Sequence, residues 1–111
     1  MAWGQALVDA LQPADIAIEK VAYSAFYQSR MAFALGRAGI DTLIFSGIVT
    51  QGGVASTLRD AHVRDFHTVV LSDGCATFNP QVHATAIADL GTISEVMSCA
   101  EALAWMGGAQ P

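Results

Sequence analysis

Two apolar runs, at residues 42–49 and 67–72, constrain the fold of this chain more than any other feature. Each run is short and almost uninterrupted, which is typical of a strand buried on both faces. Segments with helical periodicity stand before, between and after the two runs. Because strands that alternate with helices pair in parallel through right-handed crossovers, this order predicts a parallel sheet with helices on both sides.

The same alternation extends over the whole chain. The periodicity predicts helices at 4–11, 28–37, 50–64, 80–90 and 98–107, and strands at 15–20, 42–49, 67–72 and 93–97. We therefore expect a single three-layer α-β-α domain over residues 1–111, with a Rossmann-like, mostly parallel sheet of about four strands. In such sheets ligands bind beyond the carboxyl ends of the strands.

Three helix ends carry their own sequence signals. Gly39 follows the second helical segment at the position where a left-handed residue ends a helix. Asn79 and Pro80 are suited to the N-cap and the first helical position of the helix predicted at 80–90. Ser98 with Glu101 three residues later forms a capping box.

Composition excludes several classes of protein. With a net charge of −5 and five Lys and Arg residues, the chain is a poor partner for nucleic acid. No apolar run reaches the roughly 18 residues that a membrane span requires. Cys75 and Cys99 form no motif, so we expect reduced thiols in a cytosolic, cytoplasmic protein. His62, His67 and His83 lack metal-ligand spacing, and neither a metal nor another cofactor is expected.

Several motifs lie on the expected strands, just after them, and on the helices that follow. They are Glu19-Lys20 with Tyr-Ser-Ala-Phe at 23–26, Asp-Thr-Leu-Ile at 41–44 with Gly-Ile-Val-Thr at 47–50, Val54, Ser-Thr at 56–57, Arg-Asp-Ala at 59–61, Asp-Gly-Cys-Ala at 73–76, His83 and Glu101. In order and spacing they resemble the isochorismatase-like cysteine hydrolases, over residues 10–103. The resemblance implies an N-terminally truncated domain, because the family's first strand has no counterpart here.

The family uses an aspartate, a lysine and a cysteine, and the resemblance maps these groups unevenly. Lys20 matches the lysine, whereas Gly53 stands at the position of the cysteine. The aspartate belongs to the first strand and has no counterpart. A cysteine at a helix N-terminus forms a thiolate readily, and the helix amides accept an oxyanion. With Gly53 that route is closed, although isochorismatases proper hydrolyse a vinyl ether without a cysteine, by protonation from a general acid.

The resemblance also suggests ligand-binding residues, each with a structural alternative. Thr50 either lines the site or N-caps the following helix. Gly52 and Gly53 either begin that helix loosely or leave room for a ligand against bare amides. Tyr23 and Phe26 either line the pocket or pack in the core or at its rim. A cis peptide bond is implied between residues 49 and 50.

Three functional interpretations stay open. The first is a hydrolase of a small amide or vinyl ether that uses Lys20 and a carboxylate from Asp15, Glu19 or Asp73. Cys75 is a further candidate nucleophile, although it lies on the wrong strand for activation by the helix. The second is a non-catalytic module that binds a small ligand, and the third is an oligomeric assembly module. Only 14% of the residues are charged and half a sheet is missing, so we expect a homo-oligomer that covers apolar surface.

Overall fold

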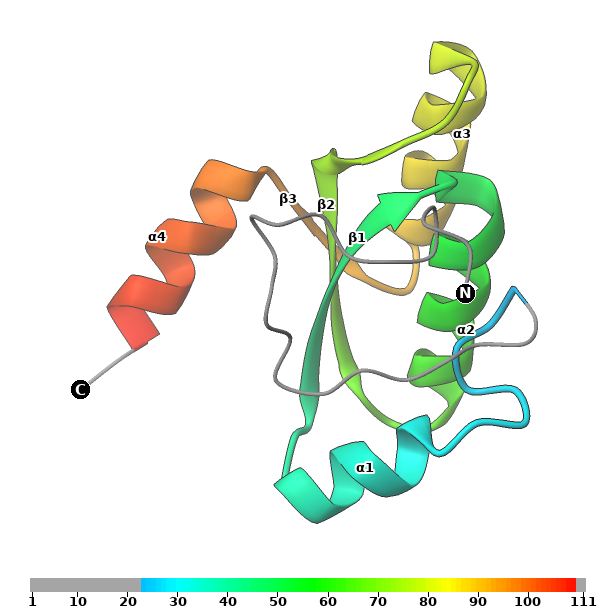
Figure 1. Ribbon diagram of the computed structural model, residues 1–111. Helices are drawn as coiled ribbons and strands as arrows, with labels where there is room; N and C mark the ends of the chain where they lie inside the picture. Colours follow the sequence, from blue (N-terminus) through cyan, green and yellow to red (C-terminus); the bar gives the residue numbers. More distant parts are fainter. Residues whose placement is uncertain (1–22, 110–111) are drawn as a thin grey trace, which may run out of the picture.

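The computed structural model describes residues 23–109. They form α1 (Met31–Ala38), β1 (Thr42–Ile48), a π-helical turn η3 (Thr50–Val54), α2 (Ala55–Val63), β2 (His67–Ala76), α3 (Pro80–Leu90), β3 (Glu95–Met97) and α4 (Cys99–Ala109) (Figure 1). The predicted helix at 4–11 and strand at 15–20 lie outside the described residues.

The three strands form one parallel sheet in the order β1-β2-β3. Thr42 pairs with His67 at the start of β1, and Ile48 pairs with Ala76 at its end. Between these points the register shifts, and Gly47 at the shift has a φ of 124°, which favours glycine. The extra residues of β2 bulge out here, so β2 runs four residues beyond the predicted end at residue 72.

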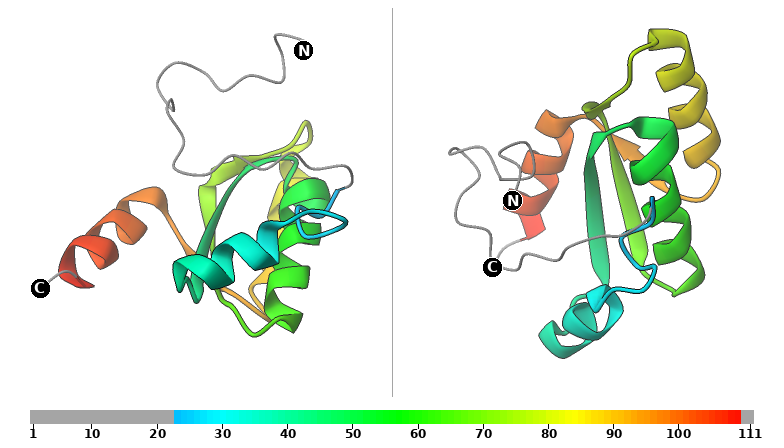
Figure 2. Two further views of the ribbon diagram at one scale, coloured as in Figure 1. Left: turned by 60° about the horizontal axis from the view of Figure 1, so that its bottom comes forward. Right: turned by 45° about the vertical axis from the view of Figure 1, so that its right-hand side comes forward.

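The helices cover both faces of the sheet. Figure 2 shows α2 and α3 side by side on one face and α4 on the opposite face. Both crossovers, β1-α2-β2 and β2-α3-β3, therefore turn in the same sense, as the handedness rule for parallel strands requires. The predicted three-layer α/β architecture with a parallel sheet is confirmed for the described residues, which contain three strands.

Each of the three predicted helix ends is confirmed. Gly39 is left-handed, with a φ of 71°, and its N–H donates to the end of α1. The Asn79 side chain accepts from the amides of Gln81 and Val82 at 2.8 and 3.3 Å. The capping box is reciprocal, since Glu101 N–H donates to Ser98 Oγ at 3.0 Å and Ser98 N–H donates to Glu101 Oε1 at 2.8 Å.

Two helix beginnings differ from the prediction. The helix expected from residue 28 begins at Met31, because residues 23–30 form turns. The helix expected over 50–64 is divided into η3 and α2. Periodicity alone could not separate these two pieces, since a single widened turn shifts the apolar positions by only one residue.

The core lies between the sheet and the α2–α3 layer. Leu58 of α2, Val70 of β2 and Leu90 of α3 are fully buried and belong to one apolar cluster. A second cluster joins Phe26, Leu35 and Ala61 beneath α1. The first cluster holds α2 against the sheet, so that the N-terminal end of α2 stays at the carboxyl edge of β1.

Candidate functional site

The candidate site is the turn that follows β1. The peptide bond between Ile48 and Val49 is cis, so the expected position between residues 49 and 50 was wrong by one residue. The turn η3 then carries Thr50, Gly52 and Gly53 at the carboxyl edge of the sheet. This is the place where ligands bind in parallel α/β sheets.

Thr50 is anchored from its side chain. The residue is 0% exposed, and its Oγ1 lies 2.7 Å from His83 Nδ1 in α3. His83 Nε2 lies 2.8 Å from the Ser72 carbonyl oxygen in β2. Thr50 does not cap a helix, because η3 begins after Val49 without a side-chain cap. The predicted capping role is therefore wrong, and the hydroxyl binds a neighbouring element instead.

Gly52 has a packing reason to be glycine. A Cβ on Gly52 would stand 2.9 Å from Val49 Cγ2, closer than real Cβ contacts allow. The Gly52 N–H donates to the Val49 carbonyl at 3.0 Å, and Val54 N–H reaches the same oxygen at 3.4 Å. Both amides are therefore engaged within the turn. The proposal of a bare amide that receives a ligand is left with the partly exposed Gly53.

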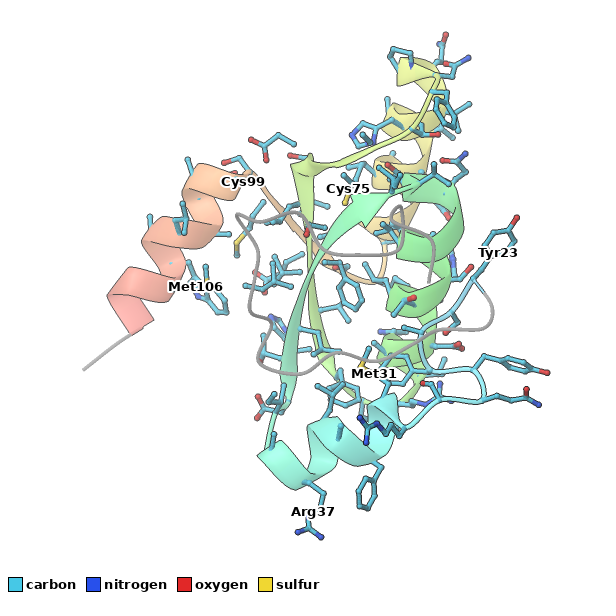
Figure 3. The ribbon with its side chains drawn as sticks, viewed as in Figure 1. Tyr23, Met31, Arg37, Cys75, Cys99 and Met106 are labelled. Atoms are coloured by element: carbon cyan, nitrogen blue, oxygen red, sulfur yellow. The ribbon has the colours of Figure 1, made fainter. Side chains whose placement is uncertain are left out.

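The two predicted aromatic residues have different environments. Tyr23 is 74% exposed, and its ring lies 4.0 Å from where a Gly52 Cβ would stand. Figure 3 shows its side chain directed outward beside α2, so Tyr23 lies at the rim of the turn. Phe26 is buried against Phe66, with ring centroids 5.9 Å apart. Core packing therefore accounts for Phe26, although it also lines an apolar cavity of 340 Å³ against β1.

The segment before α1 is held against α2 by backbone contacts. The Ala25 N–H donates to Thr57 Oγ1 at 3.0 Å, and the Thr57 hydroxyl reaches the Tyr23 carbonyl at 3.5 Å. These bonds explain why Tyr23 lies beside the turn. Lys20, the predicted catalytic lysine, lies outside the described residues together with Asp15 and Glu19.

Asp73 is the candidate carboxylate that the structure describes. Its Oδ1 accepts from the Cys99 N–H at 2.7 Å and thereby ties β2 to the start of α4. Hydrogen bonds from the Cys99 side chain and backbone lower the pKa of this carboxyl. Asp73 is therefore ionised at neutral pH, which suits it to act as a helix partner and not as a proton donor.

Neither thiol is prepared to act as a nucleophile. Cys75 lies inside β2, not beyond its end as predicted, and its Sγ donates to the Phe45 carbonyl at 3.7 Å. Burial raises the pKa of the Cys75 thiol, and the hydrogen bond with Asp73 raises that of Cys99. Figure 3 shows the two residues apart, Cys75 within the body and Cys99 at the start of α4. Because the thiolate is the reactive form, Cys75 does not replace the missing family cysteine.

A groove that the sequence did not predict separates α2 from α3. Its volume is 640 Å³, and polar side chains from both helices and from the start of η3 line it, among them Gln51, Ser56, Gln81 and Thr85. An ion pair between Arg59 and Asp89 bridges the two helices. The partner of Arg59 belongs to α3, and no sequence pattern indicates this pairing.

Within residues 23–109, no group of three or more His, Cys, Asp or Glu side chains is arranged to hold a metal ion. In the same range, no helix has the length and apolar character needed to cross a membrane.

A turn that follows a parallel strand at the carboxyl edge of the sheet, beside an α-helical layer, is typical of ligand-binding α/β proteins, and the relatives of this chain identify the family. The family model named isochorismatase domain matches residues 1–101. Ureidoacrylate amidohydrolase RutB of Methylobacterium radiotolerans is 39% identical over 108 residues, or 91% of this chain and 42% of that protein. The protein of the same name from Methylorubrum extorquens is 44% identical over 80 residues, or 70% of this chain and 32% of that protein.

Solved structures agree with the sequence relatives. An isochorismatase-like hydrolase from Alkaliphilus metalliredigens superposes with a TM-score of 0.87 at 29% identity, covering 94% of this chain and 59% of that one. The nicotinamidase SaPncA from Staphylococcus aureus gives a TM-score of 0.69 at 26% identity, covering 71% and 52%. The chain belongs to the isochorismatase family, and it spans 42% of the length of the first relative named above.

Gly52→Ala is expected to lower the free energy of unfolding by about 1–3 kcal/mol, because the new methyl group would collide with Val49. Gly36→Ala is the matched control, since Gly36 lies in α1 with nothing within 4 Å of the added Cβ. That control should raise stability by about 0.5–1 kcal/mol. Urea unfolding of both variants is the measurement, and equal changes would contradict the packing argument.

Asp73→Asn is expected to flatten the pH dependence of stability in acid. The folded pKa of Asp73 is lowered, so its contribution is present above the unfolded pKa of about 4 and is lost as the pH falls through the folded value. Thermal melting between pH 2 and pH 6 is the measurement. Cys99→Ala keeps the backbone donor and should give an intermediate slope, whereas an unchanged slope for Asp73→Asn would refute the assignment.

Proposed function

We propose that this chain belongs to a hydrolase that cleaves a small vinyl ether and uses no cysteine thiolate as nucleophile. The observation that carries the proposal is Gly53 in the family's nucleophile position, within an intact turn. An amide hydrolysed through a thioester needs a sulfur there, whereas a vinyl ether needs protonation and then attack by water. Lys20 is proposed to hold the negatively charged part of the substrate.

The proton donor is proposed to lie outside the described residues. The bonds to Cys99 lower the pKa of Asp73 below its ordinary acidic value, which argues against this carboxyl as a general acid at neutral pH. Asp15 and Glu19, which precede Lys20 in the sequence, are the other carboxyls considered, and a neighbouring subunit is a third source. A general acid has to lie within hydrogen-bond reach of the reacting atom.

A second candidate function is a non-catalytic module that binds a small ligand at the same turn. It is favoured by one observation, namely that Asp73, the carboxyl considered as proton donor within residues 23–109, is committed to the start of α4. Under this proposal Lys20 and Gly53 bind an anion, and nothing is turned over.

The purified chain is to be incubated with isochorismate, as a vinyl ether, and with nicotinamide and ureidoacrylate, as amides. We expect release of product from the vinyl ether alone, loss of at least tenfold in kcat/KM with Lys20→Ala, and no inhibition by iodoacetamide, because both described thiols have raised pKa values. Product is measured by nuclear magnetic resonance (NMR).

Gly53→Cys is the companion variant, and iodoacetamide should label its new thiol at the helix end faster than Cys75 or Cys99. Amide turnover in the unmodified chain, abolished by iodoacetamide, would overturn the proposal. Binding of isochorismate that depends on Lys20, without turnover, would support the non-catalytic module.

We further propose that the chain assembles with copies of itself through α4. Leu103, Trp105 and Met106 of this helix are exposed, and several large exposed apolar side chains on one element are typical of interaction surfaces. Leu103→Glu is expected to shift the assembly toward monomer in multi-angle light scattering. Val63→Glu is the control at an equally exposed site on α2. A concentration-independent monomer of the unmodified chain would refute the assembly.

A further inference from the structure

A hydrogen-bonded path crosses three elements at the carboxyl edge of the sheet. It runs from Thr50 in η3, through the His83 ring in α3, to the Ser72 carbonyl in β2, with distances of 2.7 and 2.8 Å. Both distances are short for bonds of these types, which indicates well-formed interactions. The path links residues far apart in the sequence, so its two bonds fix the positions of η3, α3 and β2 relative to one another.

The partners assign the donors along this path. A carbonyl oxygen only accepts, so the Nε2 of His83 carries the hydrogen and donates to Ser72. In the neutral ring Nδ1 is then an acceptor, and the Thr50 hydroxyl donates to it. The geometry thus defines one tautomer of His83, which is an observable property of the side chain.

A hydroxyl that donates to a histidine, with the histidine held from its other side, is also the arrangement of an activated nucleophile. Burial decides against that role. Thr50 is 0% exposed, so no substrate atom reaches its oxygen in this structure. The pair is therefore suited to holding the turn in place.

We infer that His83 is a positioning residue that holds Thr50, and through it the turn that presents Gly53. The significance of this role for catalysis rests on the proposed function. The turn needs such an anchor because its two bonds to the Val49 carbonyl are unequal, with the Gly52 amide at 3.0 Å but the Val54 amide at 3.4 Å. Neither η3 nor α2 has a side-chain cap at its beginning.

Loss of either partner leaves the other polar group without its bond, the buried hydroxyl of Thr50 or the partly buried ring nitrogen of His83. Thr50→Val removes the hydroxyl while keeping the shape, and strands His83 Nδ1. His83→Ala strands the Thr50 hydroxyl and opens space beside α3. An unpaired polar group of this kind costs free energy, and we expect the loss to appear first as local opening of the turn that the bond held.

Amide hydrogen exchange of the full chain, followed by NMR, tests the inference without a substrate. Thr50→Val and His83→Ala should speed exchange of the Gly52 and Val54 amides by about tenfold, the equivalent of one hydrogen bond. The amides of Val69 and Val70, in the buried centre of β2, should change by less than twofold. The ¹⁵N shifts of His83 should report the tautomer with hydrogen on Nε2.

Two conservative variants separate the bonds. In His83→Asn the side-chain oxygen takes the place of Nδ1 and accepts from Thr50, so protection of Gly52 and Val54 should return. In His83→Gln the side-chain amide takes the place of Nε2 and donates to Ser72, so protection should stay low. Rescue by Asn and not by Gln assigns the effect to the Thr50 bond.

Three results would overturn the inference. They are unchanged exchange at Gly52 and Val54, an equal increase at all amides including Val69 and Val70, and a His83 ring with hydrogen on Nδ1 alone. None of these measurements needs turnover. Failure of the proposed vinyl-ether hydrolysis therefore leaves the positioning role standing, and loss of the positioning role leaves the substrate question standing.

Discussion

The parallel pairing of β1 with β2 is the constraint on which the rest of the structure depends. Both strands were expected to be buried on two faces, but only β2 has buried residues, at 68–70 and at Cys75, whereas every residue of β1 is partly or fully exposed. The crossover that joins them places α2 on one face, and the next crossover places α3 beside it. Through this arrangement the turn after β1 and the end of β2 meet at the carboxyl edge of the sheet, where the candidate site lies.

At this edge the backbone, more than the side chains, defines the site. The Val49 carbonyl accepts hydrogen bonds from the amides of Gly52 and Val54. The Val49 side chain fills the space that a Cβ on Gly52 would need. The turn is therefore compact, and it presents position 53 without a functional side chain. The resemblance assigns the family's nucleophile to position 53, where this chain has glycine within an ordered turn.

The described ionisable side chains near the site, Asp73, Cys75 and Cys99, are likewise engaged in structural contacts. The pKa of Asp73 is lowered by its bonds to Cys99, and the pKa of Cys99 is raised by the same partner. These two side chains stabilise each other at the start of α4, on the other face of the sheet from the Cys75 cluster. Cys75 is buried with a raised pKa. Asp73, Cys75 and Cys99 thus contribute to the packing of elements, and for this reason the proposed chemistry relies on Lys20 and its neighbours.

Much of this was determined by the sequence alone, where the signal is local. Alternation of apolar runs with helices specified the parallel sheet, and the signals at Gly39, Asn79 and Ser98 with Glu101 specified three helix ends, since caps depend on residues within one turn. The family and the glycine at position 53 also followed from residue order. The tertiary structure decided what depends on residues distant in the chain. The register shift at Gly47 extended β2 past Cys75, and the packing of α3 beside η3 gave Thr50 its partner in His83. No local pattern encodes either outcome, because both arise from contacts that form only when the strands have paired.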